Sequence, residues 1–195
     1  GDPPSSAQNA VMDTALLYRY AGASTLAPEV DTPHTQEWVS ACADRWGIGL
    51  APTSARMAGL FLAQYRETAR SGEDEVAFDG GWAQPHTVAR ALTTLSQVVQ
   101  ARFARSAAEM SAARDPIITV GDGYMRFEGF SQCAGVYARV DVTPAGLLGD
   151  IHSPGTTNVD FNPPMLAALA QLPADRLLAV QLGSESFAIT PAGAA

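Results

Sequence analysis

The sequence predicts an α+β fold, in which a helical amino-terminal half packs with an antiparallel, sheet-rich carboxy-terminal half. As far as residue 115, apolar residues recur at spacings of three and four, the period of an amphipathic helix. After Pro116 the period changes to two, as in half-buried strands. No repeat or low-complexity linker separates the halves. We therefore expect a single domain over residues 12–190, with a helical part (12–115) and a sheet-rich part (116–190), between tails at 1–11 and 191–195.

Helices are expected at three places in the first half. Thr32-Pro33 can cap and begin a helix whose apolar stripe contains Trp38, Val39, Cys42 and Trp46. A second helix is expected over 53–70, ending at Ser71-Gly72, because glycine adopts the left-handed conformation found after helix ends. The longest helix is expected over 84–113. Pro85 begins it, and Asp115-Pro116 ends it because a residue before proline avoids the helical region.

A hairpin and a one-sided strand are expected next. Residues 117–120 and 124–128 flank Gly121-Asp122-Gly123, whose Asp-Gly step favours a tight hairpin. Residues 136–142 alternate between apolar and polar, which predicts a strand with one solvated face.

The remaining segments predict strands around a short helix. Val159 and Phe161 alternate with polar residues, and Asn162-Pro163-Pro164 is typical of a helix start, with the helix continuing to about Leu172. A last hairpin is expected between 177–182 and 187–190.

Composition and charge exclude several classes of function. The net charge is −8 and all 12 basic residues are arginine, so the chain is a poor electrostatic partner for nucleic acid or anionic lipid. A phosphate-binding loop of the GxxxxGK[ST] type needs a lysine, and no other cofactor motif is present, so no cofactor is expected. No apolar run is long enough for a membrane helix, and the opening residues lack the pattern of a signal peptide. We therefore expect a cytoplasmic protein that acts neither on membranes nor on nucleic acid.

The sharpest catalytic hypothesis is a cysteine nucleophile. Cys133 lies in a connection of small residues between two expected strands, where a thiol can be exposed. His152 is the candidate base, and Asp150 or Asp160 is the candidate group that orients it. In the alternative interpretation, Cys133 is a buried small residue at a tight turn.

A polar row offers a second hypothesis. Asn158, Asp160 and Asn162 alternate along one strand, and their oxygens are ligands that a hard cation prefers. The alternative is a solvent-facing row in which Asn162 caps the following helix. No Cys/His spacing typical of zinc is present.

Several segments resemble one family. Residues 126–142 (RFEGFSQCAGVYARVDV), 155–164 (GTTNVDFNPP) with 166–170 (LAALA), and 18–24 (YRYAGAS) resemble the region ahead of the zinc finger in actinobacterial SWIM zinc-finger family proteins. The SWIM signature CxCx(n)CxH is missing here, so the family's zinc binding is carried onto no residue of this chain. Residues 28–79 lie outside the resemblance.

The resemblance implies a bacterial cytoplasmic protein whose domain ahead of the finger mediates protein contacts. Together with the missing catalytic motifs, it favours a non-catalytic protein-interaction or scaffolding domain with a protein partner. The alternative is a small hydrolase or transferase that uses Cys133 and His152.

Overall fold

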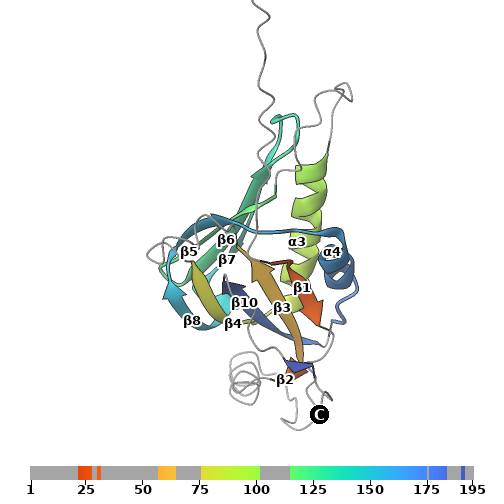
Figure 1. Cartoon of the computed structure of the whole chain (residues 1–195). Coiled ribbons are helices and arrows are strands. Elements are labelled where there is room, and N and C mark those ends of the chain that lie inside the picture. Colours follow the sequence, from red (N-terminus) through yellow and green to blue (C-terminus); the bar gives the residue numbers. More distant parts are fainter. Residues whose placement is uncertain are drawn as a thin grey trace, which may run out of the picture.

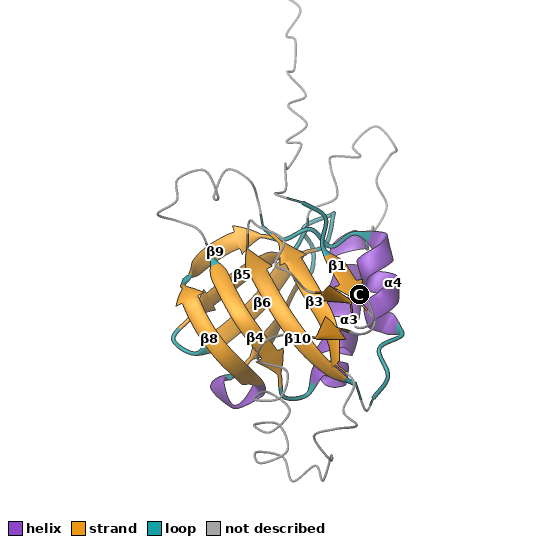
Figure 2. Cartoon of the chain, turned by 60° about the horizontal axis from the view of Figure 1, so that its bottom comes forward, coloured by secondary structure: helices purple, strands orange, loops and turns teal. Residues whose placement is uncertain are grey.

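Two larger β-sheets and two α-helices dominate the part of the chain that the computed structural model describes: residues 22–27, 30–31, 57–64, 76–101, 115–174, 176–183 and 190–191. The larger sheet has five strands in the order β1-β3-β10-β4-β8, and the other has four in the order β7-β6-β5-β9. A short pair, β11-β2, forms a separate two-stranded sheet, and its β2 contacts β3. Figure 1 follows the elements along the chain, and Figure 2 shows α3 and α4 together on one side of the strands.

The five-stranded sheet joins strands from both halves of the sequence. Its members are β1 (Thr25–Ala27), β3 (Met57–Ala63), β10 (Leu177–Gly183), β4 (Ala77–Trp82) and β8 (Leu147–Ser153). β10 lies at the centre, parallel to β3 and antiparallel to β4. Every residue of β3 and β10 is buried, which explains why both strands are apolar runs without alternation.

The four-stranded sheet is antiparallel throughout. It consists of β7 (Tyr137–Val142), β6 (Tyr124–Phe130), β5 (Ile117–Gly121) and β9 (Gly155–Asn158). The predicted β5–β6 hairpin is confirmed. Asp122 and Gly123 have φ values of 48° and 76°, and positive φ at both central residues is the geometry that matches strand twist. The predicted one-sided strand is also confirmed as β7, whose odd-numbered residues are exposed.

The two sheets share one core. β8 leads into β9 with only Pro154 between them, so one segment passes from the edge of one sheet to the edge of the other. Inner side chains from both sheets, α3 and α4 form one apolar cluster. At its centre Phe127 packs edge-on against Trp82, with ring centroids 6.0 Å apart, and against Phe161 at 6.2 Å.

Helix α3 (Pro85–Gln100) packs against β6 and β7, and α4 (Pro163–Ala170) packs against α3 and β1. Gly129 allows the close approach of α3, because a Cβ there would lie 2.6 Å from a methyl group of Val99. No helix in the described residues is long and apolar enough to cross a membrane.

The prediction of a helical amino-terminal half is wrong. The described residues are mostly β, and β1, β3 and β4 from the first half build most of the five-stranded sheet. Residues 53–70, predicted as a helix, contain β3 instead. A short, unbroken apolar run fits a buried helix as well as a buried strand, so periodicity could not decide between them. Pairing with β10 and β1 decides it.

The other predicted elements had mixed outcomes. Helix α3 confirms a helix beginning at Pro85, but the predicted extent to residue 113 is wrong, because α3 ends at Gln100 and Ala101 is already extended. Residues 102–114 and the stripe from Trp38 to Trp46 lie outside the described residues. The last predicted hairpin is not formed as expected, because β10 has β3 and β4 on its two sides. Thr190-Pro191 (β11) pairs with Val30-Asp31 (β2) instead.

Candidate protein-interaction face

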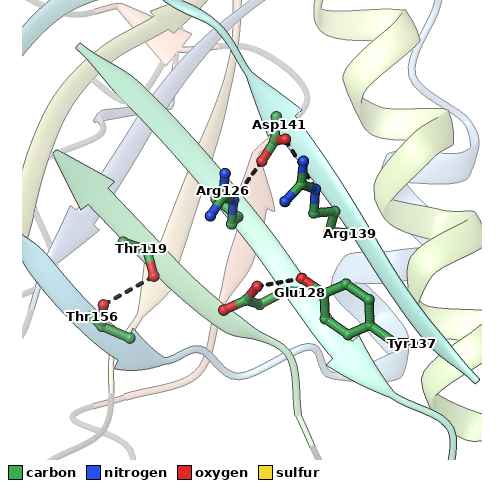
Figure 3. A network of polar contacts seen from close by, with 7 residues as sticks. All are labelled: Thr119, Arg126, Glu128, Tyr137, Arg139, Asp141 and Thr156. Atoms are coloured by element: carbon green, nitrogen blue, oxygen red, sulfur yellow. Dashed lines mark hydrogen bonds and ion pairs between the residues drawn. The ribbon is translucent and has the colours of Figure 1, made fainter. Parts of the chain in front are cut away.

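One face of the four-stranded sheet carries an ordered set of polar and aromatic side chains, shown from close by in Figure 3. Met125 and Phe127 on β6 point into the core and are fully buried, so their neighbours in sequence point the other way. We call this side the outer face. Its side chains are Ile117, Thr119, Tyr124, Arg126, Glu128, Phe130, Tyr137, Arg139, Asp141, Thr156 and Asn158.

A three-residue ionic cluster lies on β6 and β7. Arg126 stands directly opposite Asp141, and its Nε donates to Asp141 Oδ1 at 2.7 Å. Arg139 Nε lies 3.2 Å from the other carboxylate oxygen, Oδ2. The hydrogen bond to Asp141 raises the pKa of the Arg126 guanidinium, which also lies over the Tyr124 ring, 5.5 Å from its centroid. All three charges are solvent-accessible, so the cluster fixes side-chain geometry more than it stabilises the fold.

Tyr137 connects Glu128, beside the ionic cluster, to an apolar end of the face. Its hydroxyl donates to Glu128 Oε2 at 2.6 Å, and this hydrogen bond raises the pKa of the phenol above its ordinary value of 10.0. Its ring lies against Phe130, which stands directly opposite on β6, with centroids 5.1 Å apart. Thr119 and Thr156 extend the polar surface across β5 and β9 through a hydroxyl–hydroxyl hydrogen bond of 2.9 Å.

The apolar end consists of Phe130 and Tyr137, whose rings are in contact, together with Val136, the exposed residue that precedes Tyr137 in the chain; we call these three residues the aromatic patch. Their exposed fractions are 50%, 47% and 42%, and among the described residues they are the large apolar side chains that stand exposed. Residues 131–136 form a tight connection between β6 and β7. The fully buried Ser131 accepts from the Val136 backbone N–H through its Oγ, and its own N–H donates to the Val136 carbonyl.

Cys133 lies in this connection and does not meet His152. The thiol is partly buried, and its Sγ is 3.4 Å from the Ser131 hydroxyl. His152 is exposed on β8, in the other sheet, where β8 pairs with β4. No hydrogen bond joins the two side chains in the described part of the chain. Asp150 also lies exposed on β8.

Asp160 and Asn162 are brought together, and they meet Ser24 rather than the cysteine. The Ser24 backbone N–H donates to Asp160 Oδ2 at 2.9 Å, and Asn162 Nδ2 donates to the same oxygen at 2.8 Å. Asn162 Nδ2 also donates to the Ser24 carbonyl, and Asn162 Oδ1 accepts from Met165 N–H, which makes Asn162 the N-cap of α4. Ser24 Oγ accepts from Ala63 N–H at the end of β3. We call these contacts the Ser24 junction.

The Ser24 junction has a structural role in joining β3, α4 and the residues before β1. Asn158, the third member of the predicted polar row, lies on β9 beside Ile117. Among the described residues, no three His, Cys, Asp or Glu side chains are grouped so as to hold a metal ion.

Sequence reasoning did not single out the outer face as a site. It identified the solvated side of β7, but it could not show that Phe130 on β6 joins Tyr137 there. The signal that was available is the alternation over 124–130, where Tyr, Arg, Glu and Phe occupy every second position.

Comparisons with known proteins identify no relative. Neither a scan against protein-family models nor searches of curated proteins and of solved structures found a match.

Proposed function

We infer that this chain is a non-catalytic protein-interaction domain and that its outer face binds a protein partner. The observation that carries the proposal is the aromatic patch, where the rings of Phe130 and Tyr137 are in contact and each side chain is about half exposed. Contiguous exposed apolar side chains with a polar surround are typical of interaction sites in water-soluble proteins.

The chemistry of the outer face fits a protein better than a polyanion. Tyr, Phe and Arg are the residue types enriched at protein interfaces, and a rigid aromatic pair can act as an anchor for binding. The charges around the patch are balanced, with Arg126 and Arg139 against Glu128 and Asp141. A surface that binds phosphate groups needs an excess of positive charge, and the whole chain has a net charge of −8.

The biological setting of the proposal comes from the sequence. The segment 126–142, which resembles SWIM zinc-finger family proteins, contains the whole aromatic patch. We therefore propose a bacterial, cytoplasmic SWIM-type protein in which this domain recruits or organises a partner and another segment holds the metal.

Site-specific photo-crosslinking in the source cells tests the proposal. A benzophenone amino acid at position 130 samples the patch, and the same group at Gln97, an exposed residue of α3, is the matched control. We expect an adduct of defined mass from position 130 and none from position 97. A Val136→Asp substitution should abolish the adduct, because a buried charge without a partner opposes docking of an apolar surface.

Equal labelling from positions 130 and 97, or an adduct that survives Val136→Asp, would contradict the proposal. Circular dichroism and thermal melting of the Val136→Asp variant serve as the control for folding. Val136 is exposed, so the substitution should leave the melting temperature close to that of the unsubstituted chain.

A further inference from the structure

The edge of β7 that faces away from β6 presents a regular row of backbone hydrogen-bonding groups. The hydrogen bond from Ser131 N–H to the Val136 carbonyl sets the pairing pattern of β6 and β7, which continues without a bulge to the pair Met125 and Val142. In antiparallel pairs, every second residue turns its N–H and C=O away from its partner strand. Tyr137, Arg139 and Asp141 are the residues that turn theirs outward.

No strand covers this edge in the described part of the chain. β7 ends the sheet order, and the outward backbone groups of Tyr137, Arg139 and Asp141 have no hydrogen-bond partner among the described residues. An exposed, regular edge is a template for pairing with another strand. The edge strand β8 differs, because Gly149 has a φ of 102° and its pairing with β4 shifts register, features that disrupt an edge.

The charged side chains of β7 are placed so that two copies of the strand can attract one another. In an antiparallel pair of two β7 strands centred on Val140, Arg139 of one copy stands opposite Asp141 of the other, and the same contact occurs twice because of the two-fold symmetry. This register places the outward-turned residues opposite one another, as a hydrogen-bonded ladder requires. Opposite charges directly across a strand pair are favourable.

The inner side of β7 supports the same pairing. Ala138 and Val140 pack against the core but remain only partly buried. A second β7 strand would set Val140 against its symmetry mate and Ala138 against Val142, which would remove more apolar surface from water.

We propose that the chain forms a two-fold symmetric dimer through β7, joining two four-stranded sheets into one continuous antiparallel sheet. The partner is a second copy of this chain. The inference does not depend on the proposed function, because the dimer uses the edge of β7 and leaves the two aromatic patches at separate places on the joined outer face.

A charge exchange between two variants tests the dimer and its register. In Arg139→Glu each edge is acidic at 139 and 141, and in Asp141→Arg each edge is basic there, so either variant alone places like charges opposite one another. Each should dimerise at least about tenfold more weakly than the unsubstituted chain in sedimentation equilibrium. An equimolar mixture should form a heterodimer with affinity restored to within a few-fold, since the two acidic side chains of one strand then face two arginines of the other.

The matched control is Arg90→Glu. Arg90 is exposed on α3, and its substitution changes the net charge by the same amount as Arg139→Glu. Dimerisation of this variant should equal that of the unsubstituted chain. Thermal melting of Asp141→Arg checks that the loss of its bond to Arg126 leaves the fold intact.

Amide hydrogen exchange gives a second readout that needs no substitution. The N–H groups of Arg139 and Asp141, which face one another in the proposed register, should become protected as protein concentration rises. Those of Ala138 and Val140, which already bond to β6, should not change. A monomer at millimolar concentration, a dimer in which Arg139→Glu and Arg90→Glu behave alike, or outward amides that exchange equally at all concentrations would overturn the proposal.

Discussion

Removing the Asp160 carboxylate is expected to lower the free energy of unfolding by about 2–3 kcal/mol. Asp160 Oδ2 accepts two hydrogen bonds, from Ser24 N–H at 2.9 Å and from Asn162 Nδ2 at 2.8 Å. Asn162 Nδ2 keeps its bond to the Ser24 carbonyl, but the Ser24 N–H belongs to a residue that is 1% exposed and would lose its acceptor. A buried donor left without an acceptor costs about 1–3 kcal/mol, and the lost second bond to a charged group adds to this.

Urea denaturation of Asp160→Ala and Asp160→Asn measures the effect. The asparagine oxygen can still accept both bonds, so this matched substitution should cost about 1 kcal/mol, mainly through the lost charge. For a chain of this size, the alanine substitution should lower the melting temperature by about 4–12 °C. An alanine variant within about 0.5 kcal/mol of the unsubstituted chain, or two variants of equal stability, would refute the role assigned to the Ser24 junction.

Three further predictions follow from particular contacts. Gly80→Ala should lower stability by about 2–3 kcal/mol or prevent folding, because its Cβ would collide with the backbone of the neighbouring strand β8; a urea titration measures this. Gln181→Met should raise stability by about 1–2 kcal/mol, because neither end of the buried Gln181 amide has a hydrogen-bond partner among the described residues. Gln64→Met, compared in the same denaturation assay, should instead be destabilising, because Gln64 Oε1 accepts from a buried backbone N–H. NMR titration should find the pKa of Tyr137 above 10.0 and closer to 10.0 in Glu128→Gln. Because the folded-state pKa is raised, the contribution of this hydrogen bond to stability is present below pH 10 and is lost as the pH rises through the raised value.

Local signals in the sequence predicted those elements whose geometry is set within a few residues. The Asp122-Gly123 step specifies the β5–β6 turn because both residues take positive φ there. Pro85 begins α3, and Asn162 caps α4 with a side-chain oxygen that reaches a backbone N–H three residues later. Each of these rules operates within about one turn of chain, so no distant contact was needed to apply it.

The five-stranded sheet was not predictable in this way. β3 is an apolar run that becomes a strand because β10, more than a hundred residues later, lies parallel to it. β4 contains two glycines and an aspartate, residue types depleted in strands, and its partners β10 and β8 both come from the second half of the chain. Its Gly80 is required by the close approach of β8, a constraint invisible until the strands are paired.

Some features of the candidate site were predictable from the sequence, and others depended on the tertiary structure. The sequence alone established an acidic chain without lysine, the solvated side of β7 and the helix cap at Asn162. Only the tertiary structure placed Phe130 beside Tyr137, separated Cys133 from His152 and joined Asp160 to Ser24. The reason is physical: turns and caps depend on neighbouring backbone dihedrals, whereas a binding surface depends on which strands pair, and pairing is decided by burial of the whole core.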